Sequence, residues 1–233
     1  MQDSKNGMIQ ALFKVGAHFG YARSRRHATM KSFVFGTKNK TDILDLTQTA
    51  PLLEEVLEYV RILGTQGKNL LFVGGKPEVS SMVRTSAASI GMPYVAGRWL
   101  GGTLSNFVEI KKRMNRMKEL IEGRESGTLA HKYTKKERLM IDREIARLEE
   151  NFAGLVTMDR LPDALVIVDT KREDNAVKEA RGLGIPVIGI MNSDCDRSLV
   201  THPIIGNDAS RESVSFFLGE IAQAFEEGRK AKT

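Results

Sequence analysis

Short apolar runs alternate with helical patterns through most of this chain, and that alternation constrains the fold more than any other feature. Largely apolar runs occur at residues 69–73, 93–96, 164–168, 186–190 and 203–205. Apolar residues spaced by three and four predict helices over residues 47–63, 77–90, 173–183 and 210–227, the first of them capped by Thr47. Strands of this kind between helices are typical of a parallel sheet that is covered on both faces. We therefore predict an α/β fold built on a doubly wound, flavodoxin-like parallel sheet.

One long segment interrupts this pattern, because no strand is indicated between residues 105 and 152. Its apolar residues recur at intervals of three and four, from Phe107 to Ile121 and again from Ile141 to Phe152. This spacing predicts an inserted antiparallel α-helical hairpin of coiled-coil type. The predicted organisation is a basic N-terminal segment at 1–46 with a short helix and small strands, a sheet domain at 47–104 and 153–228, the hairpin at 105–152, and a tail at 229–233.

Positive charge is concentrated at the start of the chain. The formal net charge is +6, and the first forty residues alone hold eight cations and one anion, including the cluster Arg23, Arg25 and Arg26. Such asymmetry is typical of a protein that binds a polyanion. A solvated surface that is basic at one end is the simpler alternative, and an anionic membrane is disfavoured because no amphipathic helix accompanies the cluster. The single cysteine, Cys195, excludes an internal disulfide and fits a reducing compartment.

The ten residues from Arg98 to Phe107 combine the only tryptophan of the chain, a glycine pair and a cation. They contain no His, Cys, Asp or Glu that could carry covalent chemistry. Gly101 and Gly102 allow a sharp turn or a close approach to a partner surface. Arg98 could grip a phosphate while Trp99 stacks on a base. Alternatively, Trp99 is buried and fixes the loop that presents Arg98.

These ten residues, Arg-Trp-Leu-Gly-Gly-Thr-Leu-Ser-Asn-Phe, resemble a block of the bacterial-type small-subunit ribosomal protein S-two family. Further blocks in the family's order occur at Val15–Gly20, Met30–Gly36, Leu71–Gly74, Leu161–Leu165, Leu183–Val187 and Gly206–Asp208. The resemblance implies an α/β domain with a coiled-coil insertion. It also implies a position on the solvent side of the small subunit between head and body, beside other ribosomal proteins and the messenger path.

A nucleotide-binding α/β enzyme is the competing hypothesis, because sheets of this class often bind nucleotides at their strand ends. Gly74-Gly75-Lys76 follows a strand, but its spacing matches neither the dinucleotide fingerprint nor the P-loop. Lys76 could touch RNA instead.

A metal ion is a further alternative at the same strand ends. Oxygen-bearing side chains after two strands suit Mg²⁺, so Asp194 and Asp208 are candidate ligands of a structural ion, and His18 could reach the same end of the sheet. Loop-capping carboxylates are the favoured interpretation. Asn192 and Arg197 stand where the resembling family usually has Asp and Pro, which argues against an inherited metal site. No catalytic residue and no cofactor is predicted.

We predict a structural constituent of the small ribosomal subunit, without enzymatic activity, that supports translation on cytoplasmic ribosomes or on those of an organelle. Its expected partners are small-subunit ribosomal RNA and neighbouring ribosomal proteins, with no membrane and no small-molecule substrate. The arginines would fork onto phosphates. The residues expected to contact RNA are Arg23, Arg25, Arg26, Lys31, Lys38, Lys40, Arg98, Trp99, Lys111 and Lys112. A third hypothesis is a non-ribosomal protein that uses the hairpin as a docking arm, although such a partner does not require a basic N-terminal segment.

Overall fold

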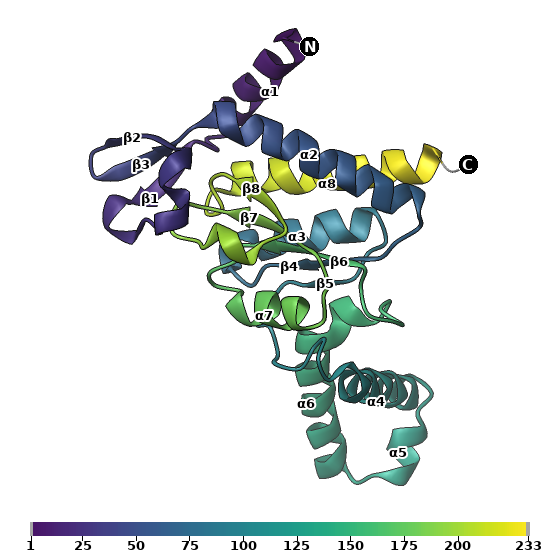
Figure 1. Ribbon diagram of the computed structural model, residues 1–233. Coiled ribbons are helices and arrows are strands. Elements are labelled where there is room, and N and C mark those ends of the chain that lie inside the picture. Colours follow the sequence, from purple (N-terminus) through teal and green to yellow (C-terminus); the bar gives the residue numbers. More distant parts are fainter. Residues whose placement is uncertain (1, 232–233) are drawn as a thin grey trace.

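The computed structural model describes residues 2–231, and its centre is a parallel sheet of five strands (Figure 1). The strand order is β5-β4-β6-β7-β8. Counted along the chain this is the 2-1-3-4-5 order of flavodoxin-like sheets, so the predicted parallel α/β sheet is confirmed. The strands are β4 Leu70–Val73, β5 Tyr94–Val95, β6 Ala164–Val168, β7 Val187–Met191 and β8 His202–Ile205.

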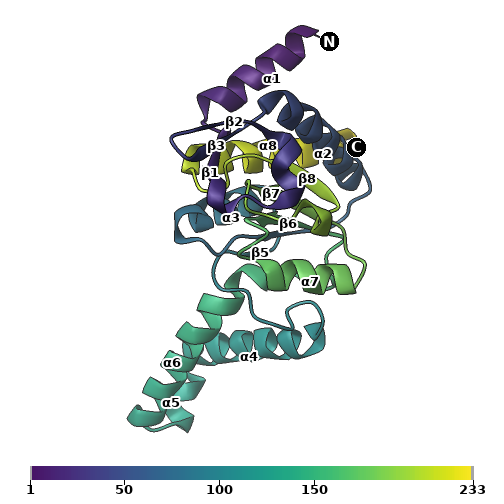
Figure 2. The same ribbon diagram turned by 60° about the vertical axis from the view of Figure 1, so that its left-hand side comes forward.

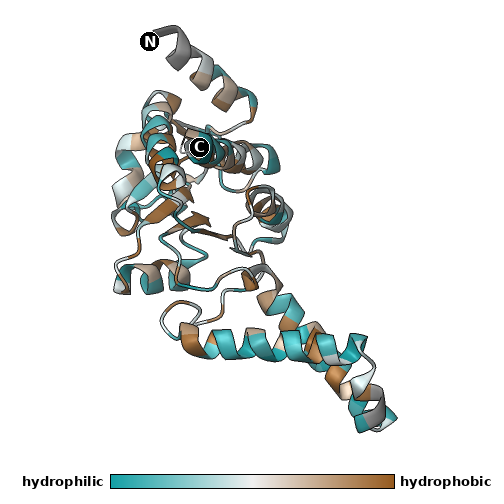
Figure 3. Cartoon of the chain, turned by 90° about the vertical axis from the view of Figure 1, so that its right-hand side faces the viewer, coloured by the Kyte–Doolittle hydropathy of each residue, from teal (hydrophilic) through white to brown (hydrophobic). Residues whose placement is uncertain are grey.

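Helices cover both faces of this sheet because successive strand residues point to opposite sides. Phe72 and Val166 pack toward α2, α3 and α8, whereas Leu71 and Leu165 pack toward α7 and the start of α4. Figure 3 shows the apolar strands enclosed between these layers. The helices of the sheet domain are α2 Leu46–Thr65, α3 Pro77–Ser89, α7 Asp174–Gly182 and α8 Arg211–Ala231.

The ends of two of these helices differ from the prediction. Asp45, not Thr47, caps α2, and its carboxylate accepts the backbone N–H of Thr47 at 3.0 Å. Both residue types favour this position, and the chain turns into the helix two residues earlier than the apolar pattern indicates. At the other end of the chain, α8 continues to Ala231, so the predicted tail is helical at its start. Residues 232–233 lie outside the described part.

The N-terminal segment forms a second, smaller sheet whose strand order is β1-β3-β2, with antiparallel pairing throughout. The strand β1 is additional to the small strands indicated by the sequence. Helix α1 precedes this sheet, and two 3₁₀ turns, η1 and η2, join β1 to β2 (Figure 1). The bounds are α1 Gln2–Lys14, β1 Phe19–Ala22, η1 Arg23–Arg25, η2 Ala28–Phe33, β2 Val34–Lys38 and β3 Thr41–Leu44.

The predicted helical insertion lies between β5 and β6. Its elements are α4 Phe107–Glu125, α5 Thr128–Lys132, α6 Lys135–Phe152 and the 3₁₀ turn η3 Ala153–Leu155. Figures 1 and 2 show these helices extending away from the α/β body, and Figure 3 shows that their ribbons are largely hydrophilic. Ile110, Met114 and Met117 of α4 are buried, as is Ile145 of α6. That the two long helices form an antiparallel coiled coil stays a prediction.

Candidate nucleic-acid interface

The β2–β3 hairpin presents exposed lysines beside Arg23. Its two-residue turn, Asn39–Lys40, has φ angles of 50° and 64°, which is the left-handed conformation that a type I′ turn requires. The backbone N–H of Arg23 donates to the carbonyl of Lys40 at 2.8 Å and ties the loop to the turn. Lys38 ends β2 and is exposed. A shallow hollow of about 690 Å³ lies here, lined by Ala22, Arg23, Ser24, Thr37 and Lys40.

The small sheet is fixed to the carboxyl edge of the main sheet. The backbone N–H of Tyr21 donates to Oγ of Ser193 at 3.0 Å, and that of His27 donates to the Ser193 carbonyl at 2.9 Å. Gly20 permits this approach, because a Cβ there would lie 2.9 Å from the carbonyl oxygen of Asp42 and 3.2 Å from Oγ of Ser193. The predicted basic segment therefore has a defined position on the body.

Arg26, which the sequence predicts to contact phosphate, forms an internal ion pair. Its Nε donates to Oδ2 of Asp42 at 2.7 Å, and its Nη2 donates to Oδ1 of Asp42 and to Oγ1 of Thr37. Asp42 is fully buried, and the Arg26 side chain is only 19% exposed. The hydrogen bonds from Arg26 lower the pKa of Asp42 against the opposing effect of burial. The Arg26 guanidinium therefore bonds to side chains of the same chain.

Arg25 and Lys31, by contrast, stay at the surface. Arg25 lies over the ring of Tyr21, with 4.5 Å between guanidinium carbon and ring centroid, and its Nη2 donates to Oδ2 of Asp194 at 3.3 Å. Its side chain remains 55% exposed. Lys31 is exposed on η2. Both residues stay in the predicted RNA-contact set.

A single carboxylate organises the block that begins at Arg98. Glu179 on α7 accepts hydrogen bonds from Nε1 of Trp99 at 3.0 Å and from the backbone N–H groups of Gly102, Leu104 and Ser105 at 2.8–3.1 Å. Burial raises the pKa of Glu179, but these hydrogen bonds outweigh it and hold the pKa below its ordinary value. Trp99 is only 6% exposed, so its ring is not available to stack on a base. The alternative role, fixing the loop that presents Arg98, is the one the contacts support.

The remaining predicted cations lie elsewhere on the molecule. Arg98 is exposed in a hollow of about 400 Å³ that Arg84, Tyr94 and two glutamates of α6 also line. On α4, Lys111 donates to the carbonyl of Asp159 at 3.2 Å, and Lys112 pairs with Glu109 at 2.6 Å. Figures 1 and 2 show α4 on the opposite side of the body from β1–β3. The structure therefore separates the predicted set into the residues of the N-terminal segment, the block at Arg98 and Trp99, and the two lysines of α4.

A buried polar cluster fills the carboxyl edge of the sheet near the point where strand order reverses, between β4 and β6. Nζ of Lys76 lies 2.6 Å from Oδ2 of Asp169 and 3.5 Å from Oδ1 of Asp208, and it donates to the hydroxyl of Tyr21 at 3.2 Å. Lys76 is 8% exposed, so the fold leaves little of its side chain for RNA to contact. Doubly wound sheets bind ligands at this position, and here the chain's own side chains occupy it.

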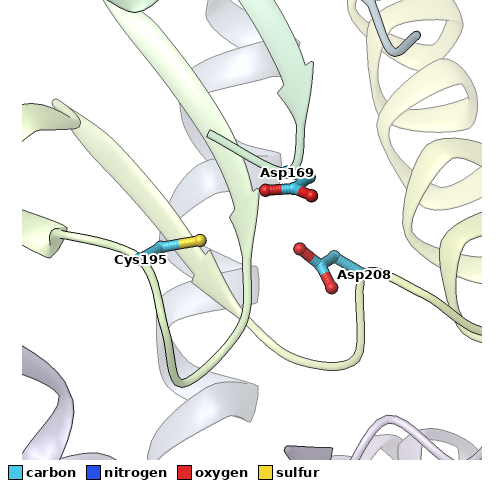
Figure 4. A group of neighbouring side chains, drawn as sticks. All are labelled: Asp169, Cys195 and Asp208. Atoms are coloured by element: carbon cyan, nitrogen blue, oxygen red, sulfur yellow. The ribbon is translucent and has the colours of Figure 1, made fainter. Parts of the chain in front are cut away.

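The candidate metal ligands His18, Asp194 and Asp208 do not converge. Asp194 faces Arg25, and His18 stacks on Phe13 with 4.5 Å between ring centroids. Asp208 instead groups with Asp169 and Cys195, whose potential ligand atoms lie within 4.8 Å of one another (Figure 4). The ammonium of Lys76 already supplies positive charge beside the carboxylates of Asp169 and Asp208. This charge weakens the attraction of the two carboxylates for a metal cation.

Burial controls the ionisation of this cluster. It raises the pKa of Asp208 to about 7, with a further contribution from the like charge of Asp169, while Lys76 opposes the shift. It also raises the pKa of Cys195 to about 12, again with help from Asp208, so the thiol stays protonated. Cys195 is a buried core side chain.

Comparison with known proteins decides the family. The sequence pattern described as "Ribosomal protein S2" matches residues 12–228. The chain belongs to the ribosomal protein S2 family. "Small ribosomal subunit protein uS2" of Microcystis aeruginosa is 42% identical over 222 residues, which cover 95% of this chain and 83% of the relative. The protein of the same name from Acidothermus cellulolyticus is 43% identical over 224 residues, with 96% and 82% covered.

A third relative carries a slightly different name. "Small ribosomal subunit protein uS2c" of Rhodomonas salina is 41% identical over 224 residues, which cover 96% of this chain and 92% of the relative. The S2 family is one of structural proteins rather than enzymes, so the family resemblance seen in the sequence and the prediction of no enzymatic activity are confirmed. Within residues 2–231, no helix of this S2 family member combines the length and apolar character needed to cross a membrane.

Proposed function

We propose that the protein is a structural constituent of the small ribosomal subunit that binds small-subunit ribosomal RNA through the exposed cations of its N-terminal segment. It would also border neighbouring ribosomal proteins and support translation, in the cytoplasm or in an organelle with its own ribosomes. Family membership supports the ribosomal role, because its relatives are named as small-subunit proteins.

One observation carries the assignment of the RNA-binding surface. Arg23 and Lys40 are exposed and line one shallow hollow on a small sheet that is fixed to the body, and Lys38 is exposed at the end of the adjoining strand β2. Cations held on a rigid scaffold suit the phosphate backbone, which dominates the affinity of most nucleic-acid contacts. Arg98, Lys111 and Lys112 would form separate, secondary contacts.

The helical insertion is proposed to be an antiparallel hairpin of coiled-coil type that reaches a neighbour in the subunit. Ile110, Met114 and Met117 on α4 share a buried apolar cluster with Phe152 at the end of α6, which supports an apolar contact between the two helices. An ion pair of 3.4 Å between Arg116 and Glu144 also joins the two helices.

The test is binding of the full chain to small-subunit ribosomal RNA across a salt series. The test variant combines Arg23→Ala with Lys40→Gly. Glycine suits the left-handed conformation of position 40, so the turn is kept while the charge is removed. The matched control combines Lys178→Ala with Lys230→Ala, which removes two cations that pair with carboxylates four residues earlier on their own helices.

A phosphate contact releases counterions, so each lost contact lowers the slope of log affinity against log salt by about 0.7–0.9. We expect a shallower slope and weaker binding for the test variant, and wild-type behaviour for the control. Equal losses in both variants would mean that only net charge matters. Unchanged binding in the test variant would remove the N-terminal segment from the interface.

A further inference from the structure

Asp194 joins two cations that are far apart in the sequence. Its Oδ2 accepts from Nη2 of Arg25 at 3.3 Å and from Nζ of Lys171 at 3.1 Å. Its side chain is 3% exposed, whereas those of Arg25 and Lys171 are 55% and 51% exposed. The buried carboxylate therefore holds the two cations side by side, and the group as a whole keeps one positive charge at the surface.

Contacts with η2 place Arg197 beside the same N-terminal segment that holds Arg25. It begins η4 Arg197–Leu199, which packs against η2. The backbone N–H of Arg197 donates to Oγ1 of Thr29 at 3.1 Å, and its guanidinium lies 5.5 Å from the ring centroid of Phe33. Arg197 is exposed, so its charged group faces solvent from a position fixed by η2. A guanidinium placed on an aromatic ring is well suited to bind phosphate with two parallel hydrogen bonds.

We propose that Lys171 and Arg197 belong to the same RNA phosphate-binding surface as Arg25, and that this surface continues the basic N-terminal segment across the carboxyl edge of the main sheet. The inference rests on the proposed function, since it names further residues of that interface. The local charges fit a polyanion: three exposed cations come from three separate loops, and the carboxylate that Arg25 and Lys171 share is buried. Lys171 and Arg197 lie in a part of the sequence with no overall positive excess, so the charge pattern does not reveal them.

Two properties of the arrangement favour binding over a purely structural role. Asp194 already has one cationic partner in Arg25, so Lys171 adds a second charge beyond simple neutralisation. Holding long side chains in place before binding also reduces the conformational entropy that binding would otherwise cost.

The experiment measures the salt dependence of small-subunit ribosomal RNA binding for Lys171→Ala and Arg197→Ala. Lys171→Arg serves as the variant that conserves charge. Lys178→Ala is the matched control, because Lys178 is 68% exposed on the nearby helix α7 and pairs only with Asp174 among the described residues. Arg197→Ala leaves Asp194 and its partners in place, so it tests the surface even if Lys171→Ala lowers stability.

We expect each alanine variant to lower the salt slope by about 0.7–0.9 and to weaken binding several-fold at low salt, with Lys171→Arg and Lys178→Ala close to wild type. Wild-type binding by Lys171→Ala and Arg197→Ala, beside weakened binding by the variant of Arg23 and Lys40, would overturn this inference and leave the proposed function standing. Wild-type binding by all of them would overturn both.

Discussion

The carboxylate of Glu179 holds the indole of Trp99 although the two residues are 80 positions apart in the sequence, with 3.0 Å between Oε1 and Nε1. The same carboxylate accepts three backbone N–H groups of the glycine-rich loop that follows Trp99. The loop thus takes its shape from a side chain of α7 rather than from its own glycines alone.

Glu179→Ala should lower the free energy of unfolding by about 2–4 kcal/mol, because several donors lose a charged acceptor at once. Urea denaturation measures this loss, and Glu122→Ala on the exposed face of α4 is the control. The pKa of Glu179 is held below its ordinary 4.5, so its contribution is complete above that pH and is lost as pH falls through the folded-state pKa. A wild-type transition midpoint for Glu179→Ala would contradict the proposed organising role.

Arg26→Ala should cost about 3–5 kcal/mol, since it leaves the buried carboxylate of Asp42 without its cation. Replacing both residues with alanine should cost less than Arg26→Ala alone, because no buried charge then remains. In Arg26→Ala the pKa of Asp42 rises, so the difference from wild type should shrink as pH falls toward the ordinary Asp value of 3.8 and below. Denaturant titrations at several pH values follow both effects. Additive losses in the double variant would argue against the pairing.

Asp208→Asn should alter the pH dependence of stability between pH 4 and 7. The folded-state pKa of Asp208 is raised to about 7 from 3.8, so the folded protein binds more protons than the unfolded chain in this range. Asp208 therefore makes the wild-type protein less stable as pH rises through this window, and the asparagine variant should lack that contribution. Unfolding free energies at pH 5 and pH 8, compared between the two proteins, test this. Parallel pH profiles would place the pKa of Asp208 near its ordinary value.

Gly228→Ala should destabilise the protein although alanine is the better helix former. An added Cβ at Gly228 would collide with the carbonyl of Arg61 on α2, and one at Gly64 would collide with that of Phe225 on α8. Overpacking of this kind costs about 1–3 kcal/mol. Gly219→Ala in the same helix meets open space and should instead stabilise the protein by about 0.5–1 kcal/mol. Opposite shifts in thermal midpoint are the expected result, and equal shifts would show that α2 and α8 are not in close contact.

The strands of the main sheet could be predicted because burial on both faces leaves continuous apolar runs, as in Ala164–Val168. The strand Phe19–Ala22 lacks that signal, since it is short and none of its four residues is fully buried. Likewise, Asp45 and Thr47 are both good helix caps. The choice between them depends on where the chain leaves β3, which local sequence does not encode.

The candidate site could be predicted only in outline. Net charge located the basic segment, but Arg23 and Arg26 are the same residue type three positions apart and have different environments. The difference comes from Asp42, which is buried by strand pairing and engages Arg26. The sequence allows two interpretations of Trp99 because the residue that decides between them, Glu179, lies in a helix with no motif linking it to the loop.

The attachment of β1 to Ser193 constrains the order of events while the protein is being synthesised. The hydrogen bond from Tyr21 to Ser193 spans 172 positions, so Tyr21 is synthesised long before the residue to which it bonds. A nascent chain contains its arginine cluster long before the carboxyl edge of the main sheet, which orients this cluster, has been synthesised. The correctly arranged basic surface therefore requires synthesis to pass Ser193, and shorter nascent chains present the same charges without their native geometry.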